Sequence, residues 1–353
     1  MSKMLELPED CGAFEWIMND YYDEMKGYNK YAIYLPSMLC NNNTLNEYLL
    51  KHTNINQTNN DDILSNEISI PYVIIFHGWT SNTHDIISMH SQTNFPYLAE
   101  KYNMIIIVPQ ALGDPPSWNG QNCCGNAVIE ERKDELFVSN LIYDISTSIK
   151  AKYNFINIDK QYIHLFGVSN GAFFVSKLTW LSSIHKNTAF GYKVTSGIAV
   201  AGYVYDNSPF INLQYYGHKK QYIPIMQYHG LRDIVVNPFG CGCNDGWKND
   251  TYFGFKHDCC CGIDKHNHDM CVSLDNEFER RIKWNDCNIP NITHFYENEY
   301  INHDNGKKCY YLDKNGKYNC KTNIVFCYLA DNGHPMLGFE HHIDVTKFRN
   351  DIE

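Results

Sequence analysis

The chain has 353 residues, 44% of them hydrophobic, so it can bury a sizeable core within one large domain or two ordinary ones. Its formal net charge is −11 and no run of Lys and Arg occurs, which argues against nucleic acid and against an anionic membrane surface as partners. The first residues lack the apolar core of a signal peptide, and nowhere do about 18 consecutive apolar residues occur. The sequence therefore predicts a globular chain with neither an export signal nor a membrane span.

The 14 cysteines suggest an oxidising compartment, whereas the absence of a visible export signal does not. A chain this rich in cysteine is typical of a disulfide-bearing protein from an oxidising compartment, whereas an ordinary reduced enzyme carries fewer. Because the two signals conflict, the sequence leaves the localisation open.

Segments that resemble strands alternate along the chain with segments that resemble helices. Several strand-like segments are apolar throughout, which is typical of strands covered on both faces. They lie at residues 30–36, 71–78, 104–110, 161–167, 196–202, 222–230 and 323–330, and the helix-like segments lie between them at residues 93–102, 135–153 and 171–184. The alternation predicts an α/β fold with a mostly parallel central sheet, helices on both faces and functional groups at the carboxyl ends of the strands. We expect one domain over residues 1–353, with its core at about 30–345.

The sequence Gly167-Val168-Ser169-Asn170-Gly171 stands directly between a strand-like and a helix-like segment. A Gly-x-Ser-x-Gly motif in this setting indicates a nucleophile elbow, in which the serine sits on a strained turn and the glycines avoid a collision across it. The following helix would also direct backbone N–H groups at a developing oxyanion. We interpret Ser169 as a nucleophile; the alternative is a serine that only occupies a turn.

A serine hydroxyl is a poor nucleophile near neutral pH, so it needs a histidine to accept its proton and a carboxylate to orient that histidine. In this architecture the chain order is serine, acid, histidine, with the last two on loops after later strands. Asp233 and His334 each follow a strand-like segment in that order, which predicts the triad Ser169, Asp233 and His334. The rivals are Asp206 for the acid and His341 or His342 for the base.

Further segments carry a family resemblance. With the motif around Ser169 they are YAIYLP, VIIFHGWTSN, IIIVPQA, WNGQNCCG, MQYHGLRDIVV, FERRIKWNDC and DNGHPM. Together they resemble the secreted polyhydroxybutyrate depolymerase, feruloyl esterase and acetyl xylan esterase group of α/β-hydrolases, over roughly residues 30–340. The resemblance implies an α/β-hydrolase fold and ester hydrolysis through an acyl-serine intermediate, with Ser169 as nucleophile, Asp233 as acid and His334 as base. It implies neither a metal nor an organic cofactor.

The resemblance also implies roles for three residues near the nucleophile. HGWTSN matches the family's oxyanion loop, which implies that the backbone N–H groups of Trp79 and Asn170 hold the oxyanion. Trp118 matches a family tryptophan near the cleft, where its ring would stack on an aryl or sugar group of the substrate. For Trp79 and for Trp118 the alternative is a residue that only packs.

The chain departs from the family pattern in two places. Asp134 and Glu135 only partly match a pair of aspartates, and we expect them to be structural. An insertion at residues 240–271, directly after the acid loop, is dense in cysteine and histidine. It has ligands for zinc but no clean pair of Cys-x-x-Cys units, so we favour a disulfide-stapled loop that overhangs the cleft as a lid.

Cysteines outside the insertion lie where secreted relatives carry disulfides. They are the adjacent Cys123 and Cys124, and Cys287 with Cys309, Cys320 or Cys327 downstream. We expect at least one bridge between the segment that ends at Cys287 and the region before His334. Such a bridge would hold the histidine loop in register.

The sequence as a whole predicts a serine carboxylic ester hydrolase acting on a feruloyl or acetyl ester of polysaccharide. Polyhydroxyalkanoate polyester is the alternative substrate, because it is cleaved by the same mechanism in a pocket of different shape. The alternative from another class is a non-catalytic Cys/His-rich binding or structural protein on a hydrolase scaffold. An ester substrate is the only partner predicted, and the oligomeric state stays open.

Overall fold

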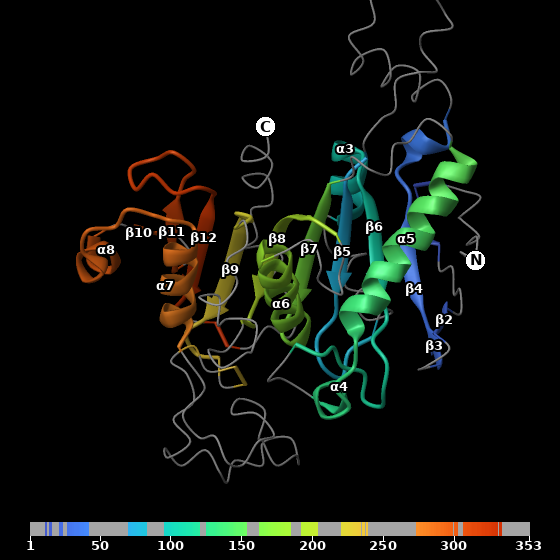
Figure 1. Ribbon diagram of the computed structural model, residues 1–353, viewed down its shortest axis with the longest axis horizontal. Helices are drawn as coiled ribbons and strands as arrows, with labels where there is room; N and C mark the ends of the chain where they lie inside the picture. Colours follow the sequence, from blue (N-terminus) through green and yellow to red (C-terminus); the bar gives the residue numbers. More distant parts are fainter. Residues whose placement is uncertain are drawn as a thin grey trace, which may run out of the picture. The chain divides into compact units, whose positions relative to one another are not determined.

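The computed structural model (Figure 1) describes residues 11–12, 14–15, 21–23, 27–41, 70–82, 95–120, 125–153, 162–184, 192–203, 220–233, 235–236, 238, 273–298, 300–302, 306–330 and 332–333. Several predictions fall outside these residues, namely the insertion at 240–271, Cys123, Cys124, Asp206, His334, His341 and His342. The chain divides into two compact units, Met1–Ile75 with Ser81–Ala111 and Asp134–His164, and Phe76–Thr80 with Leu112–Lys133 and Leu165–Glu353.

The first unit contains strands in the order β1-β4-β6-β5. Strands β1 (Phe14–Glu15), β4 (Tyr31–Tyr34) and β6 (Ile105–Pro109) pair antiparallel one to the next, and β5 (Tyr72–Phe76) pairs parallel with β6. Every side chain of β4, β5 and β6 is buried, as expected of apolar runs without polar alternation. The remaining elements are the antiparallel pair β2 (Tyr21–Asp23) and β3 (Gly27–Asn29), the 3-10 helix η1 (Ser37–Leu39), α3 (Phe95–Tyr102) and α5 (Asp134–Lys152).

The second unit contains strands in the order β7-β8-β9-β12-β11-β10. Strand β9 pairs parallel with both β8 and β12, so these three strands have their carboxyl ends at the same edge. Strands β11 and β10 continue beyond β12 with antiparallel pairing. The elements are β7 (Ile163–Val168), β8 (Val194–Val200), β9 (Ile225–Gly230), β10 (Tyr300–Asn302), β11 (Lys307–Leu312), β12 (Ile324–Leu329), α4 (Asn126–Ile129), α6 (Asn170–Ile184), α7 (Leu274–Trp284) and α8 (Ile292–Asn298).

Helix α6 is the most deeply placed helix of this unit, because every described side chain on it is buried. It packs on β8, and its Trp180 contacts a buried ion pair that lies within α7. Glu277 of α7 accepts from Arg281 Nε at 2.8 Å and from Trp180 Nε1 of α6 at 3.1 Å. The Arg281 guanidinium lies 3.9 Å from the centroid of the Trp180 ring. Each charge therefore has a partner in the interior, where an unpaired charge would be strongly destabilising.

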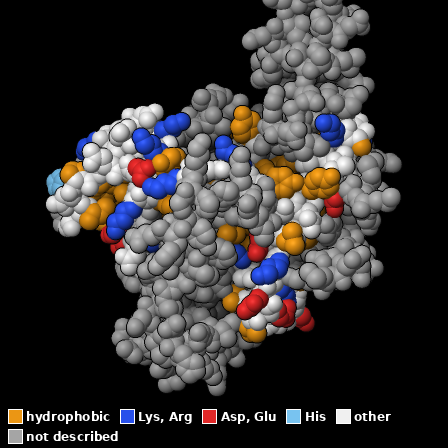
Figure 2. Space-filling model, in the orientation of Figure 1, with side chains coloured by type: hydrophobic (Ala, Val, Ile, Leu, Met, Phe, Trp, Pro, Cys, Tyr) orange, Lys and Arg blue, Asp and Glu red, His pale blue; other side chains and the backbone are white. Residues whose placement is uncertain are grey.

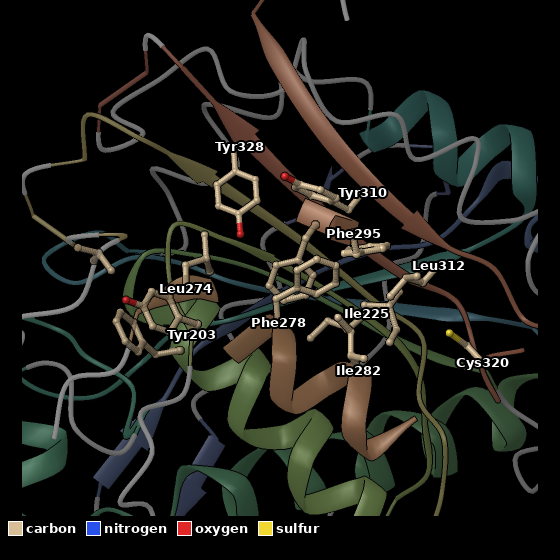
Figure 3. Close-up of a cluster of buried hydrophobic side chains, with 14 residues drawn as sticks. Tyr203, Ile225, Leu274, Phe278, Ile282, Phe295, Tyr310, Leu312, Cys320 and Tyr328 are labelled. Carbon is tan, nitrogen blue, oxygen red and sulfur yellow. The ribbon is translucent and has the colours of Figure 1, made fainter. Parts of the chain in front are cut away.

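A cluster of buried hydrophobic side chains lies beside α7 and includes residues of β9, β11 and β12 (Figure 3). Phe278 of α7 stacks on Phe326 of β12 with ring centroids 4.1 Å apart, and its ring lies 5.9 Å from that of Phe295. Tyr328 donates its hydroxyl to Asp275 at 2.5 Å, and burial together with this carboxylate raises the pKa of Tyr328 well above its usual value. The cluster supports β9 and β12, the strands that precede Asp233 and residues 332–333.

Every strand-like segment of the sequence is a strand and the three helix-like segments are helices, with ends shifted by a few residues. The sheet is mixed rather than simply parallel, because antiparallel pairs occur beside the parallel ones. Sequence patterning missed β11, whose residues KKCYYL mix lysines with aromatic residues. It also missed α7, in which charged residues occupy most positions outside the buried stripe.

Three disulfides join described cysteines, Cys11 to Cys40, Cys287 to Cys320, and Cys309 to Cys327. The second confirms the predicted bridge between the segment ending at Cys287 and the region before the histidine loop. The third joins residues directly opposite each other on β11 and β12. Both bridges therefore lie on the part of the second unit that leads toward the predicted base.

Described charged side chains of both signs are interspersed on the face shown in Figure 2. Over the part of the chain that the structure describes, no helix combines the length and the apolar character needed to cross a membrane.

Candidate active site

Ser169 lies on the turn between β7 and α6. Its φ of 54° places the backbone in the left-handed region, which is costly for a residue with a side chain. The Ser169 N–H donates to the Val200 carbonyl at 2.8 Å. The Ser169 carbonyl accepts from the N–H groups of Ala172 and Phe173 at 2.8 and 3.1 Å. The surrounding backbone thus holds Ser169 in the strained conformation that the motif predicts for a nucleophile.

The two glycines of the motif are required by close approaches of the backbone. A Cβ on Gly167 would lie 2.9 Å from the Ala172 nitrogen and closer still to the Gly171 carbonyl. A Cβ on Gly171 would lie 2.7 Å from the His77 carbonyl oxygen and closer still to that of Phe76. Since real Cβ atoms are essentially never found within 3.0 Å of another heavy atom, neither position accepts a side chain without movement of the backbone.

Residues 77–79 pass directly beside the serine. A Cβ on Gly78 would lie 3.4 Å from Ser169 Cβ and 3.9 Å from Ser169 Oγ. The buried His77 places Nδ1 2.8 Å from the Gly78 carbonyl oxygen, and Nδ1 donates because a carbonyl oxygen only accepts. In a trans peptide the C=O of Gly78 and the N–H of Trp79 point in opposite directions, so this bond also fixes the direction of the Trp79 N–H. Sequence reasoning missed His77, although its place directly after a buried strand was a signal.

The Trp79 ring packs against neighbouring residues. A Cβ on Gly125 would lie 2.8 Å from Trp79 Nε1 and 2.9 Å from Ser117 Oγ. The ring also packs against the cluster around Phe278. The ring thus packs within the second unit, and the role of the Trp79 backbone N–H as an oxyanion donor stays a prediction.

Trp118 is fully buried, with 0% of its surface exposed. Its ring stacks on Phe174 at a centroid distance of 5.3 Å and meets Phe76 edge-on at 5.2 Å. Its backbone N–H donates to Asn170 Oδ1 at 2.6 Å, and Asn170 Nδ2 donates back to the Trp118 carbonyl at 3.0 Å. This burial favours the packing alternative over an aromatic wall that stacks on substrate.

Asp233 lies in the turn after β9 and is 3% exposed. Its Oδ1 accepts from the N–H groups of Val235 and Val236 at 2.9 and 2.8 Å. Its Oδ2 lies 3.4 Å from Nε2 of the buried His229, and that nitrogen lies 2.7 Å from the Val236 carbonyl oxygen. These contacts fix the carboxylate in one orientation. Sequence reasoning missed His229, which lies on β9 four residues before Asp233.

The acid loop is joined directly to the segment that precedes the predicted base. Arg232 donates its backbone N–H to the Asn332 carbonyl at 3.0 Å. A Cβ on Gly230 would lie 2.6 Å from the Gly333 carbonyl oxygen, so the two backbones touch. His334 is the next residue in the sequence and lies outside the described residues. The structure therefore brings the loop that carries Asp233 beside Gly333, the residue before the predicted base.

Asp134 and Glu135 occupy the first turn of α5 and are 4% and 6% exposed. Carboxylates in the first turn are stabilised by the helix dipole, which agrees with the structural role expected of them. Within the described ranges, no group of three or more His, Cys, Asp or Glu residues is arranged to hold a metal ion.

The structural neighbours of the chain are α/β-hydrolase esterases. An acetyl xylan esterase from Aspergillus awamori is 12% identical, with 96% of this chain and 98% of that chain covered and a TM-score of 0.47. An S-formylglutathione hydrolase from Staphylococcus aureus is 12% identical (65% and 82% covered, TM-score 0.38), and a poly(3-hydroxybutyrate) depolymerase from Bordetella parapertussis is 16% identical (64% and 66% covered, TM-score 0.34). No family model and no curated protein matches the sequence. Likenesses this distant carry no conclusion about activity or substrate.

Proposed function

We propose that the chain is a serine carboxylic ester hydrolase with Ser169 as nucleophile, Asp233 as acid and His334 as base. The observation that carries the proposal is the strained Ser169 turn with residues 77–79 beside its Oγ. A serine held at a left-handed φ by its surroundings is the arrangement that exposes a nucleophile at the end of a strand. The joint between the acid loop and the segment before His334 supports the other two roles.

Acylation follows from these roles. Ser169 Oγ attacks the ester carbonyl carbon while His334 takes its proton, and Asp233 orients His334 and stabilises its charged form. The negative charge that develops on the carbonyl oxygen is held by the backbone N–H groups of Trp79 and Asn170. The C–O bond then breaks, and the alcohol leaves with the proton from His334.

Deacylation repeats these steps with water. His334 takes a proton from water as the water oxygen attacks the acyl carbon, and the oxyanion occupies the same two N–H groups. Collapse releases the acid and returns the proton to Ser169 Oγ. The chain's own side chains and backbone supply every group in this sequence.

The proposed substrates are feruloyl and acetyl esters of polysaccharide, a preference over polyester that rests on the 14% content of aromatic residues. The alternative is a polyhydroxyalkanoate, which needs the same catalytic groups. Because Trp118 is buried, we assign its ring to packing and not to substrate contact.

Covalent labelling tests the proposed reaction. Wild-type protein should react with a fluorophosphonate probe at Ser169, and Ser169→Ala should not react. Ser176→Ala is the matched control, because Ser176 is a buried serine on α6, the helix that follows Ser169, and it contacts Arg281. This variant should keep wild-type labelling. Wild-type protein that does not label while folded would instead favour the non-catalytic binding or structural protein.

A substrate panel tests the proposed ester class. Methyl ferulate, acetylated xylan and hydroxybutyrate oligomers are compared at equal ester concentration. We expect cleavage of the ferulate or the acetylated xylan; turnover of the oligomers alone would contradict the proposed substrate and leave the hydrolase assignment intact.

A further inference from the structure

We propose that the Asn170 side chain is a positioning group that sets the spacing of the two oxyanion donors by clamping residues 116–119, the strut segment. The inference rests on the ester hydrolase proposed above and adds a role for a side chain where that proposal uses only the backbone of Asn170.

The clamp consists of two reciprocal hydrogen bonds. The Trp118 N–H donates to Asn170 Oδ1 at 2.6 Å, and Asn170 Nδ2 donates to the Trp118 carbonyl at 3.0 Å. Both residues are 0% exposed. Because a backbone N–H only donates and a carbonyl only accepts, the clamp needs a donor and an acceptor held side by side. A primary amide supplies both, whereas an ionised carboxylate supplies only acceptors.

The strut segment is held by one face of α6. Asn170, Phe174 and Lys177 follow the spacing of residues on one helix face. Phe174 stacks on the Trp118 ring at 5.3 Å with an interplanar angle of 8°, and Lys177 Nζ donates to the Asn119 carbonyl at 2.9 Å. The clamp is thus the first of three attachments between this face and the segment, and it is the one next to Ser169.

The same segment is attached to the loop that carries the other donor. Thr80, directly after Trp79, donates its N–H to the Pro116 carbonyl at 3.2 Å. The ring of His77, which fixes the Gly78 carbonyl, lies 5.3 Å from the ring of Trp118. Residues 116–119 therefore link Asn170 to the loop that carries Trp79, the two residues whose backbone N–H groups are the proposed oxyanion donors.

This arrangement determines what the clamp contributes to catalysis. Rotation of the Asn170 peptide would pull its side chain away from two buried partners, so the clamp holds the peptide still. Donors stabilise an oxyanion best when their positions are set before the charge develops. Loss of the clamp should weaken this stabilisation in the transition state more than it weakens binding of the neutral ester, so kcat should fall while KM changes little.

The test compares kcat and KM of the full chain with those of Asn170→Ala and Asn170→Asp on a soluble aryl acetate, at a temperature where circular dichroism shows each protein folded. We expect Asn170→Ala to lower kcat by about 10- to 100-fold, somewhat less than complete loss of an oxyanion donor costs, with KM within about threefold.

Asn170→Asp gives a sharper signature. An ionised carboxylate would face the Trp118 carbonyl and could not donate to it, so one bond of the clamp would be lost. The dipole of α6 acts in the opposite direction, because it stabilises a negative charge in the first turn of the helix. A protonated carboxyl again offers one donor and one acceptor. The ratio of variant to wild-type kcat should therefore rise as the pH falls from 8 toward 5, the region in which a carboxyl made unfavourable in its ionised form takes up its proton.

Asn285→Asp is the matched control, because Asn285 is 1% exposed and donates Nδ2 to the Arg281 carbonyl at the end of α7. The Asn285→Asp variant should lose stability and keep wild-type kcat.

If both Asn170 variants keep wild-type kcat while Ser169→Ala abolishes turnover, the inference is wrong and the hydrolase proposal stands. If Asn170→Ala does not fold, the kcat ratio of Asn170→Asp decides, and a ratio independent of pH overturns the inference. If Ser169→Ala keeps wild-type turnover, the hydrolase proposal is wrong and the inference falls with it.

Discussion

The turn that carries Ser169 and the joint that carries Asp233 are built in different ways. The serine turn is made of the consecutive residues 167–171, and its glycines leave no room for a Cβ. The acid lies in a joint between the loops after β9 and β12, whose members are far apart in the sequence and meet through backbone hydrogen bonds. A short sequence motif can specify a turn made of consecutive residues, whereas it cannot specify a contact between segments that are far apart in the sequence.

The two sites also have different supports. The serine turn rests on backbone bonds and on a helix buried on every side. The strands beside the acid joint rest on the aromatic cluster around Phe278 and on the disulfides Cys287–Cys320 and Cys309–Cys327. An added methyl group should disrupt the serine turn at Gly167 or Gly171 and the acid joint at Gly230, where a Cβ would meet backbone atoms. The acid joint should in addition weaken when a distant support is removed.

The largest expected effect is on the acid. Asp233→Asn should lower kcat by roughly 10⁴-fold, because an amide in place of Oδ2 favours the wrong tautomer of the histidine. Asp286→Asn is the control: Asp286 is an aspartate bound to Lys220 and Tyr222 near the surface and should leave kcat unchanged. Steady-state kinetics measures kcat of each variant. If Asp233→Asn stays active while Asp206→Asn is inactive, the role of catalytic acid would be reassigned to Asp206.

The serine turn is broken most directly by Gly171→Ala. The added Cβ would press on the carbonyl oxygens of Phe76 and His77, so we expect the free energy of unfolding to fall by about 3 kcal/mol or more. At the acid joint, a Cβ on Gly333 would lie 3.6 Å from the Arg232 carbonyl oxygen, an ordinary contact, so Gly333→Ala should cost much less. Urea unfolding measures both; equal losses would contradict the difference in backbone crowding between Gly171 and Gly333.

Removal of a distant support comes next. Replacing both Cys287 and Cys320 by alanine opens a crosslink between residues separated by 33 positions and should lower the free energy of unfolding by about 2–4 kcal/mol. The expected kcat at low temperature is that of the wild type, because the bridge touches no proposed catalytic group. Reductant should destabilise the wild type and leave the variant less affected. A variant as stable as the wild type would show that the joint does not depend on this bridge.

The smallest expected effect concerns pH and the strand that leads to Ser169. Burial lowers the pKa of His164 on β7 from 6.5 to about 4. The unfolded chain therefore takes up a proton between these values that the folded chain does not, so stability should fall as the pH falls from 6.5 toward 4. His164→Gln should remove about 1 to 2 kcal/mol of this decline, since the side chain is partly exposed. Identical slopes of unfolding free energy against pH for the two proteins would contradict this.

Much of the fold could be predicted because its strands are apolar throughout. Residues 105–108, for example, are Ile, Ile, Ile and Val and are completely buried. A segment of this kind is stable only inside a layered structure, whatever its partners are. Strand β11 has no such apolar run. It is part of the sheet because it pairs antiparallel with β12, to which the Cys309–Cys327 disulfide also joins it. Pattern alone therefore misses it.

The candidate site divides in the same way. The sequence by itself determined the local part of the serine turn, because the φ of Ser169 and the close approach of Gly167 to Gly171 involve residues within five positions. The requirement for glycine at 171 is tertiary, since the carbonyls of Phe76 and His77 approach it. Only the tertiary structure decided that Trp118 is fully buried and stacked on Phe174. It alone also placed the amide of Asn170 on the Trp118 backbone. The burial and the hydrogen-bond partners of a side chain depend on which distant segments pack around it, and that packing is a property of the whole fold and not of the local sequence.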